Sequence, residues 1–304
     1  MNRIGVVIVT YNRLDLLKEC ISAIFNQTRN VEKIIIINNA SNDGTKEYLE
    51  EYNSNDLFYI QNLNNNIGGA GGFREGLKYA LESELDWVVI IDDDAILRDD
   101  YILKIDEAIS KNPDNLAFSG TVMVNGEIDQ IHRRNVSFRL LYRESLIDKK
   151  EYEKEYFLCD LATFCGLVVN VPLIKKIGLP KQDYFIQFDD TEYSFRILKH
   201  SRIMNINSAI LDHKTVVPNN KAQLDWKGFY GIRNKLDVIK LHCNNTCYQL
   251  FRLRVWGAML KSSICACAGK HKSLYKYSKE LYKDALKDDK NGILGKKEKY
   301  LPNK

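Results

Sequence analysis

Three consecutive aspartates, Asp92, Asp93 and Asp94, are the side chains in this sequence with the clearest capacity for chemistry. They follow the apolar run Trp87 to Ile91, which has the length and composition of a strand buried on both faces of a parallel sheet. Adjacent carboxylates repel one another, and a divalent cation with oxygen ligands relieves that repulsion and attracts phosphate groups. The triplet therefore predicts a metal-bridged nucleotide site. The alternative is a solvated acidic turn that caps a helix beginning at Ala95.

The elements that must position these carboxylates alternate between strand-like and helix-like patterns. Apolar runs of strand length occur at residues 4–9, 34–37, 58–60, 87–91 and 164–169. Between the earlier runs, apolar residues recur at helical spacing, first Leu14, Leu17, Ile21 and Ile24 and later Phe73, Leu77 and Leu81. This alternation predicts an α/β fold with a parallel sheet built from βαβ units.

Polar residues follow three of the strand-like runs. Thr10, Asn12 and Arg13 follow the first run, Asn39 follows the second, and the aspartates follow the fourth. The carboxyl ends of parallel strands share one edge of the sheet, and open α/β sheets bind their ligands there. We therefore expect the three polar clusters to converge on one ligand.

The rest of the chain divides unevenly in pattern and charge. Residues past about 222 read as mostly helical, and we place a domain boundary near Pro218, which gives domains at 1–217 and 218–304. Residues 250–304 carry 14 Lys or Arg against 5 Asp or Glu, whereas the preceding residues carry 30 against 35. A basic segment suits anionic lipid, nucleic acid or water, and charge alone does not choose among them.

The basic segment also contains aromatic and aliphatic residues. Four cations, Arg252, Arg254, Lys261 and Lys270, flank the apolar residues Val255, Trp256, Met259 and Leu260. This mixture predicts contact with an anionic membrane, and a helix packed on the core explains it equally well.

Cysteine usage and hydropathy indicate the cellular compartment. The seven cysteines are odd in number and lack Cys-x-x-Cys spacing, which favours reduced thiols in the cytosol over disulfides or a zinc site. The first apolar run is too short for a signal peptide, and we expect no spanning helix, because no apolar stretch reaches roughly 18 residues.

A glycine-rich string at Asn64-Asn65-Asn66-Ile67-Gly68-Gly69-Ala70-Gly71-Gly72-Phe73 precedes the aspartates. It lacks the Gly-x-Gly-x-x-Gly spacing of dinucleotide-binding folds. Its backbone N–H groups suit close approach to a diphosphate or sugar, and tight packing at a helix entry is the alternative. Together with the aspartates, the string resembles the galactofuranosyltransferase and rhamnosyltransferase branch of the family 2 glycosyltransferases, and the resemblance covers most of residues 3–236.

The resemblance implies a fold and a catalytic centre. Family 2 enzymes are inverting transferases of the GT-A fold, a Rossmann-like mixed, mainly parallel sheet flanked by helices, here followed by a C-terminal helical extension. By resemblance, Asp190 is the base that deprotonates the acceptor, and His213 joins Asp92 and Asp94 in binding Mn²⁺ or Mg²⁺. The alternatives are a helix cap for Asp190 and a structural role for His213.

The resemblance also implies three groups of binding residues. They are Thr10, Asn12, Arg13, Asn39 and Asp93 around the nucleotide, Asn66, Gly68, Gly69 and Arg233 around the donor sugar and diphosphate, and Phe164, Phe188 and Asp189 around the acceptor. Arg233 has a surface-helix packing role as its alternative. Two positions depart from the family pattern: Asn39 stands where many relatives have aspartate, and Thr163-Phe164-Cys165-Gly166 lacks the tryptophan of some galactofuranosyltransferases.

The implied activity is transfer of galactofuranose from UDP-galactofuranose to a hydroxyl of a growing bacterial surface glycan, lipid-linked acceptors included. Rhamnosyl transfer from dTDP-rhamnose is the second reading. A nucleotidyltransferase and an inactive protein that binds nucleotide sugars or glycans remain as further alternatives. The implied partners are a nucleotide sugar, a glycan and an anionic membrane, without nucleic acid, and the implied location is the cytoplasm at the inner face of the membrane.

Overall fold

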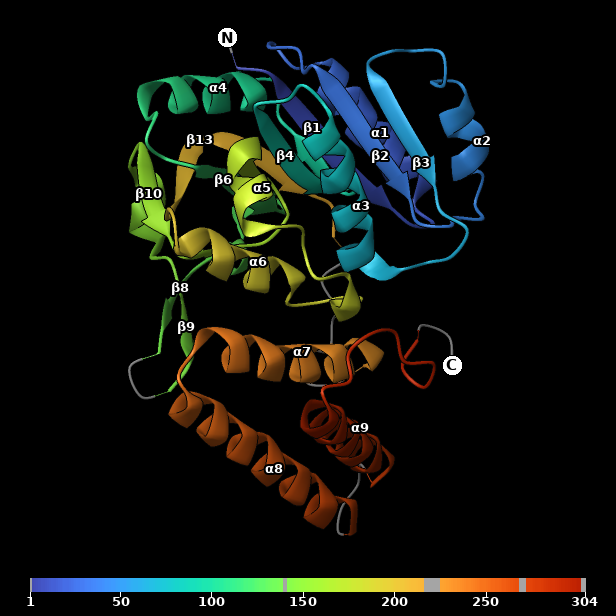
Figure 1. Cartoon of the computed structure of the whole chain (residues 1–304), viewed down its shortest axis with the longest axis vertical. Helices are drawn as coiled ribbons and strands as arrows, with labels where there is room; N and C mark the ends of the chain where they lie inside the picture. Colours follow the sequence, from blue (N-terminus) through green and yellow to red (C-terminus); the bar gives the residue numbers. More distant parts are fainter. Residues whose placement is uncertain (1, 139–140, 216–224, 268–271, 302–304) are drawn as a thin grey trace. The chain divides into compact units, whose positions relative to one another are not determined.

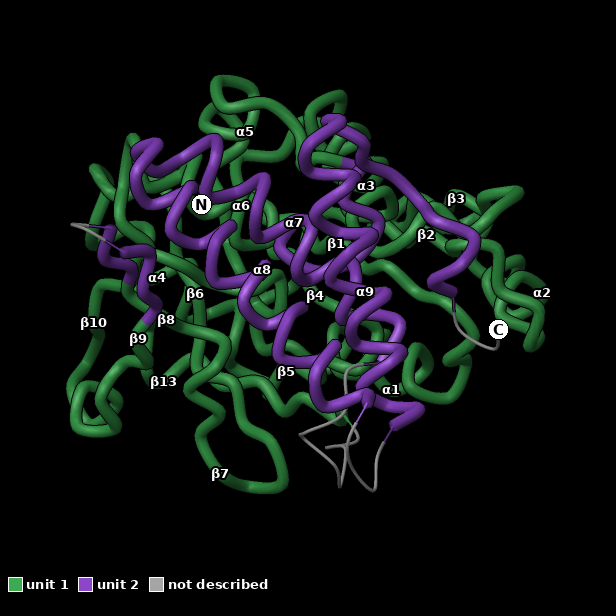
Figure 2. The backbone as a smooth tube through the Cα atoms, turned by 90° about the horizontal axis from the view of Figure 1, so that it is seen from below, with its two compact units in different colours: residues 1–135, 145–181, 190–216 green, residues 136–144, 182–189, 217–304 purple. Residues whose placement is uncertain are grey.

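The computed structural model describes residues 2–138, 141–215, 225–267 and 272–301. They form two compact units, which Figure 2 distinguishes by colour. Unit 1 comprises residues 1–135, 145–181 and 190–216, and unit 2 comprises residues 136–144, 182–189 and 217–304. The boundary expected near Pro218 falls among residues 216–224, outside the described residues.

Unit 1 is built around a mixed sheet (Figure 1). In spatial order its main strands are β10 (Tyr156–Cys159), β13 (Ile203–His213), β6 (Ala117–Val124), β12 (Leu167–Asn170), β4 (Trp87–Asp92), β1 (Ile4–Thr10), β2 (Lys33–Asn38) and β3 (Phe58–Asn62). Two short strands extend it, β5 (Ala95–Leu97) beside β13 and β7 (Glu127–Ile128) beside β6. A separate set of three strands contains β11 (Leu161–Ala162), β8 (Arg133–Ser137) and β9 (Arg143–Leu146).

The pairing confirms a mixed, mainly parallel sheet. Strands β3, β2, β1 and β4 pair in parallel, as the βαβ pattern predicts. The run predicted at residues 164–169 becomes β12, which is antiparallel to both β4 and β6. Since β13 is parallel to β6, the strands β1, β2, β3, β4, β6 and β13 all point the same way.

Helices cover both faces of this sheet. One face packs under α1 (Leu14–Phe25), α2 (Thr45–Glu50) and α4 (Tyr101–Lys111), which bury residues such as Ile21, Leu49 and Ile105. The other face packs under α3 (Gly68–Glu82), α5 (Val171–Ile177) and α6 (Asp189–Leu198). Successive residues of β1 enter opposite cores, since Val6 and Ile8 belong to one cluster and Val7 and Val9 to the other. This two-sided burial explains the uninterrupted apolar runs in the sequence.

Unit 2 is mostly helical, as predicted for the residues past 222. Its helices are α7 (Trp226–His242), α8 (Asn245–Cys267) and α9 (Lys272–Asn291). Its core joins Phe185, Phe229, Tyr230, Leu281 and Tyr300, with the rings of Phe229 and Tyr300 stacked 4.3 Å apart. Among the described residues of both units, we find no helix with the length and apolar character needed to cross a bilayer.

The glycines of the Gly-rich string and Gly76, which follows it, lie inside α3 and divide into two kinds. A Cβ atom on Gly72 or Gly76 would lie about 2.5 Å or less from Val9 or Val7 of β1, so these glycines allow α3 to approach the sheet closely. Gly68 has a positive φ of 80°, which favours glycine at the start of the helix. A Cβ on Gly69 would meet none of the described atoms within 4 Å. Packing therefore explains Gly72 and Gly76 but not Gly69.

This division predicts opposite effects of alanine on stability within one helix. Gly76→Ala is expected to lower the free energy of unfolding by about 1–3 kcal/mol, because the new methyl group overpacks against Val7. Gly69→Ala is expected to leave it unchanged or raise it by up to about 1 kcal/mol through the higher helix propensity of alanine. Urea denaturation of the two variants measures the difference. Equal destabilisation would show that α3 does not approach β1 as described.

Candidate active site

The polar clusters at the strand ends lie at one edge of the sheet, as predicted. Thr10 of β1 is in register with Asn38 of β2, and Val9 is in register with Asp92 of β4. Asp92 ends β4, and Asp93 and Asp94 form the turn to β5, so residues 95–97 form a strand and do not begin a helix. The helix-cap alternative for this acidic turn is therefore wrong.

Strand pairing brings His213 to the same turn from a distant part of the sequence. β5 pairs antiparallel with the end of β13, which sets His213 opposite Ala95. The backbone N–H of Lys214 also donates to the carbonyl of Asp94 over 2.8 Å. The backbone therefore fixes His213 beside the aspartates.

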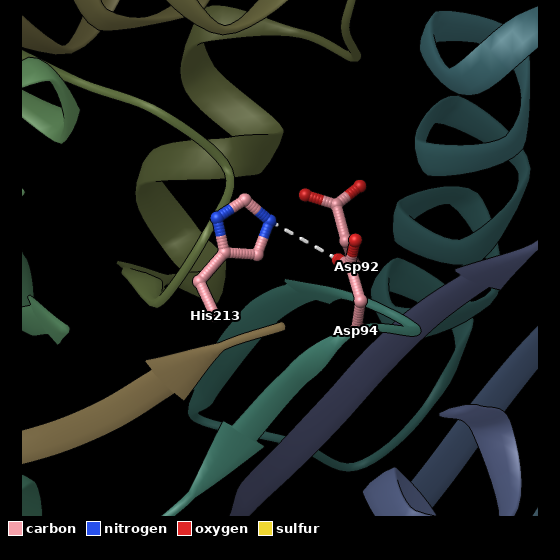
Figure 3. A group of neighbouring side chains, drawn as sticks. All are labelled: Asp92, Asp94 and His213. Atoms are coloured by element: carbon pink, nitrogen blue, oxygen red, sulfur yellow. Dashed lines mark ion pairs between the residues drawn. The ribbon is translucent and has the colours of Figure 1, made fainter. Parts of the chain in front are cut away.

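Asp92, Asp94 and His213 converge as a group of potential metal ligands (Figure 3). One ligand atom from each lies within 4.8 Å of the others. The His213 Nε2 atom is 3.1 Å from Asp94 Oδ1 in an ion pair, but the angle is not that of a hydrogen bond. Asp94 Oδ1 and His213 Nδ1 thus lack hydrogen-bond partners among the described residues, although both are buried. These three residues fit a cation that accepts mixed oxygen and nitrogen ligands.

The electrostatics of this group favour a bound cation. Burial and the neighbouring Asp94 carboxylate raise the pKa of Asp92 to about 7. Burial alone would raise the pKa of Asp94, but its contact with His213 and the charge of Arg13 outweigh burial and lower it. The same contact raises the pKa of His213 against the opposing effect of burial. The Asp92 and Asp94 carboxylates thus lie close together with little exposure to solvent, and the charged groups of the protein balance only part of their negative charge.

Asp93 has different partners from the other two aspartates. Its carboxylate accepts a 2.8 Å hydrogen bond from the Thr10 hydroxyl and pairs with Arg13 at 3.2 Å. Burial outweighs these contacts and raises its pKa to about 6. Arg13 also contacts Asp94 at 2.6 Å, and 46% of its side chain is exposed. The structure thus brings together Thr10, Arg13 and Asp93, three of the residues predicted to bind the nucleotide.

Asn39 and Asn66 are two further predicted site residues whose side chains contact each other. The Asn39 side-chain amide donates to Asn66 Oδ1 and to the Gly68 carbonyl, both at 3.1 Å, and accepts from the Ile67 N–H at 2.9 Å. Only 2% of Asn39 is exposed. The amide that stands in place of the family's aspartate therefore ties the start of α3 to the end of β2.

Asn12 shapes the loop that follows β1. It has a positive φ of 52°, which asparagine tolerates better than most residues. Its side-chain oxygen accepts from the Asn42 N–H at 2.8 Å, and its own N–H donates to Ser41 at 3.0 Å. These two hydrogen bonds thus link the loop after β1 to the loop after β2.

Asp190 stands in the first turn of α6. Its Oδ1 accepts from the backbone N–H and the hydroxyl of the next residue, Thr191, at 2.5 and 3.1 Å. Ser194 anchors α6 by bonding both the N–H and the carbonyl of Ala162. Phe164 is 3% exposed and packs between Phe73 and Tyr193. Its ring therefore supports α6 from the core and offers no open face to a sugar.

In unit 2, the segment that leads into α6 has a strained backbone. Phe185, Gln187 and Phe188 all have φ between 63° and 66°, which costs non-glycine residues about 1–3 kcal/mol each. Asp189, which follows, is 8% exposed, and Lys235 lies 5.4 Å from the Phe188 ring. Strain of this kind persists only where the surroundings hold it, and it collects at functional sites.

Arg233 and Asn234 of α7 hold this segment. The buried Asn234 amide donates to the carbonyls of Tyr184, Ile186 and Gln187 at 2.8–3.0 Å. Arg233 is 1% exposed, and its guanidinium donates to the Gly295 carbonyl at 2.6 Å and contacts the Asn234 oxygen. Both side chains are thus engaged with backbone and with each other inside unit 2. Sequence reasoning gave Asn234 no role, since the pattern of α7 alone does not reveal what its amide binds.

Replacing Asn234 by leucine is expected to destabilise unit 2 and to slow the reaction. The change removes the donor from three carbonyls, and a buried polar group without a partner costs about 1–3 kcal/mol. The strained segment then relaxes, and the backbone entering Asp190 moves with it. Thermal unfolding and kcat measure the two effects, with the exposed residue Asn53→Leu as control. A variant with lowered stability but unchanged kcat would exclude a role in catalysis.

His132 is a second residue that sequence reasoning did not assign. Its ring meets the ring of His213 edge to face, with centroids 5.2 Å apart, and its Nδ1 lies 2.6 Å from the Thr163 hydroxyl. Burial and the neighbouring Arg133 hold its pKa well below the usual value, so the ring is neutral. A lone histidine in an irregular segment carries no sequence signal for this contact, which the fold alone creates.

The chain is similar in sequence to proteins with known names. It is 24% identical over 197 residues to Galactofuranosyltransferase GlfT1 of Mycolicibacterium smegmatis, a match that covers 64% of each chain. It is 24% identical over 208 residues to dTDP-rhamnosyl transferase RfbF of Shigella flexneri, covering 67% of this chain and 66% of that one. The matched region thus spans just under two thirds of the length of these relatives.

The fold and a family comparison agree with these similarities. The structure resembles the crystal structure of GalNAc-T7 with UDP, GalNAc and Mn²⁺, with a TM-score of 0.66 and 16% identity, over 96% of this chain and 56% of that one. This likeness confirms the GT-A fold. The family described as Glycosyl transferase family 2 matches residues 5–170, more than half of the sequence. With the aspartates at the strand ends inside the matched region, the chain belongs to glycosyl transferase family 2.

Proposed function

We propose that this protein is a metal-dependent inverting glycosyltransferase that moves galactofuranose from UDP-galactofuranose to a hydroxyl of a growing bacterial surface glycan. The observation that carries the proposal is the meeting of Asp92, Asp94 and His213 at the strand ends of a family 2 chain. The relative named as a galactofuranosyltransferase supports the choice of sugar.

The three converging side chains are the proposed ligands of a divalent cation, Mn²⁺ or Mg²⁺. Their unused lone pairs and incompletely balanced charge support this assignment. A solved structure of similar fold contains UDP and Mn²⁺, which also supports it. A cation held there supplies positive charge to the donor pyrophosphate and to the departing nucleotide.

The chain's own residues would bind and orient the donor. The proposed nucleotide site consists of Thr10, Asn12, Arg13, Asn39 and Asp93. The half-exposed Arg13 guanidinium is the positive charge that this site presents to a ligand. Asn66, Gly68 and Gly69 form the proposed sugar and diphosphate site, and the open space beside Gly69 supports this. We give Arg233 a positioning role in unit 2 in place of direct phosphate contact, because its guanidinium already binds backbone carbonyls.

The proposed reaction inverts the anomeric carbon in one displacement. The acceptor hydroxyl oxygen bonds to that carbon while the bond to the diphosphate oxygen breaks, and the nucleotide diphosphate leaves. Asp190 takes the hydroxyl proton. Phe188 and Asp189 are the proposed acceptor contacts, and buried Phe164 supports α6 within unit 1.

Rhamnosyl transfer from dTDP-rhamnose is the second candidate, favoured by the relative named as a dTDP-rhamnosyl transferase. Purified protein with Mn²⁺, Mg²⁺ or chelator, assayed against UDP-galactofuranose, dTDP-rhamnose and UDP-galactopyranose, separates the candidates by mass of the glycan product. We expect transfer of galactofuranose with metal only. Transfer of rhamnose would select the second candidate, and binding without turnover of any donor would indicate an inactive nucleotide-sugar-binding protein.

We place the proposed activity in the cytoplasm at the inner face of the cell membrane, where a lipid-linked glycan is an accessible acceptor. Fractionation of cells that express the protein tests this location, and recovery in the periplasm or medium would contradict it.

A further inference from the structure

Helix α8 of unit 2 carries a line of exposed apolar side chains. Leu253, Trp256, Leu260 and Ile264 follow one another at helical spacing, so they lie on one face over about three turns. Their exposed fractions are 62%, 51%, 40% and 71%. The buried residues of α8, among them Tyr248 and Val255, lie on other faces. The described residues of unit 2 thus leave this line exposed, and we call it the apolar stripe.

Helix α9 carries a line of lysines. Lys276, Lys279, Lys283, Lys287 and Lys290 recur at intervals of three and four residues and so share one face, which we call the lysine row. Three of the four acidic residues of α9 lie on other faces and bind within unit 2, whereas Glu280 borders the lysine row and pairs with Lys299 at 3.7 Å. Asp284 accepts from Lys299 and Tyr300, Asp288 pairs with Lys297, and Asp289 accepts from Tyr248. With five lysines and one bordering acid that is itself paired, the lysine row remains strongly positive.

The apolar stripe and the lysine row meet at one groove. Helices α8 and α9 border a groove of about 580 Å³, whose lining includes Leu253, Trp256, Met259, Leu286, Lys283 and Lys287. Arg252 and Lys290 also line it. Helix α8 itself has three basic residues and no acidic one. Apolar side chains and a row of cations therefore face the same opening in unit 2.

We propose that the apolar stripe and the lysine row dock unit 2 on the surface of an anionic phospholipid bilayer. Exposed Trp, Leu and Ile side chains enter the boundary between headgroups and acyl chains, where tryptophan is favoured. The lysines lie against the phosphate groups, whose negative charge complements the row. A second copy docked by the same surface would bring two lysine rows together, which like-charge repulsion opposes. The inference goes beyond the proposed transfer reaction and depends on unit 2 alone.

The surface that the structure shows differs from the membrane-facing residues expected from sequence. Val255 is 5% exposed and faces the interior, Met259 is only half-buried in the groove, and Lys270 lies outside the described residues. The surface instead consists of residues from two helices, and the lysines of α9 contribute most of its charge.

Vesicle flotation of the full-length protein tests the proposal. Vesicles of phosphatidylglycerol and phosphatidylethanolamine are compared with vesicles of phosphatidylcholine alone, at low and high salt. We expect the protein to float with the anionic vesicles, to remain behind with the neutral ones, and to float less at high salt. Absence of flotation with anionic vesicles would overturn the proposal.

Two variants and one matched control make the test specific. The triple variant Lys283→Glu, Lys287→Glu, Lys290→Glu is expected to lower vesicle binding at least about tenfold. Trp256→Ser with Ile264→Ser is expected to lower binding while the preference for anionic vesicles remains. The control Lys46→Glu, Lys78→Glu, Lys199→Glu changes the same charge on exposed lysines of unit 1 and should bind as the wild type. Equal loss in both triple variants would mean attraction by net charge only and would overturn the proposal.

Two further measurements separate docking from other causes. Circular dichroism of each variant checks that the exposed substitutions leave the helices intact. Analytical ultracentrifugation checks the alternative occupant, since a dimer that the Trp256→Ser, Ile264→Ser variant abolishes would show that a second copy covers the stripe. Turnover with a water-soluble acceptor should be unaltered in every variant, so failure of docking and failure of the proposed transfer reaction are distinguishable.

Discussion

Asp190→Asn is expected to lower kcat by about 10²- to 10⁴-fold, the usual contribution of general base catalysis. Asparagine keeps the size of the side chain and an oxygen that can accept from the Thr191 N–H, so α6 should retain its first turn. Only the capacity to take a proton is lost. Initial rates at saturating donor and acceptor measure kcat, and calorimetric titration of the donor nucleotide measures binding.

The split between turnover and binding decides the role of Asp190. If it is the base, affinity for UDP stays within about twofold of the wild type, since the proposed nucleotide site consists of other residues. The control Asp15→Asn changes an exposed acidic residue in the first turn of α1 and should leave kcat unaltered. Parallel loss of UDP binding in Asp190→Asn would instead favour the capping role, in which the side chain holds the structure of α6.

The positions that sequence could predict are those where local pattern and strand direction suffice. Asp92 ends a fully apolar run, and the parallel register then places it opposite Val9, at the same edge of the sheet where Thr10 pairs with Asn38. His213 needed the family resemblance, because nothing local indicates that β13 ends opposite Ala95. The glycines show the same limit, since the Gly-rich string contains a packing position at Gly72 and an open position at Gly69.

The positions that sequence could not predict depend on contacts between distant segments. The carbonyls that Asn234 binds belong to a segment whose positive φ angles no pattern of aromatic residues announces. The position of Phe164 in the core depends on the packing of α3 and α6, whereas the family resemblance implies an acceptor contact at this residue. Backbone strain and side-chain burial are properties of tertiary packing, and local periodicity carries little information on either.

Asp92→Asn and Asp94→Asn are expected to abolish metal-dependent turnover, with a loss of at least about 10²-fold. A cation in such a site contributes several kcal/mol of charge stabilisation in the transition state, and each 1.4 kcal/mol corresponds to about tenfold in rate. Chelator should lower the turnover of the wild type to the same extent, and added Mn²⁺ should restore that turnover. Metal titrations of the initial rate measure this dependence.

The thermal stability of the substrate-free protein is a second measurement that tests whether Asp92 is a metal ligand. Asp92 and Asp94 are neighbouring like charges with little solvent exposure, and His213 and Arg13 are the cationic groups that balance them among the described residues. In chelator, Asp92→Asn is therefore expected to be more stable than the wild type by about 1 kcal/mol, or a Tm rise of roughly 2–4 °C. Adding Mn²⁺ should reverse the order. Binding to the folded wild type at 100 times Kd adds about 2.7 kcal/mol, whereas the variant gains little.

The control Asp99→Asn, at an exposed position after β5, should behave as the wild type in both conditions. Opposite effects of one substitution on the metal-free and metal-bound proteins would separate a ligand from an ordinary structural carboxylate, which stabilises the fold whether or not metal is present. If Asp92→Asn instead lowers Tm in chelator and Mn²⁺ raises the Tm of variant and wild type equally, the carboxylates are not metal ligands, and the metal-dependent mechanism fails with them.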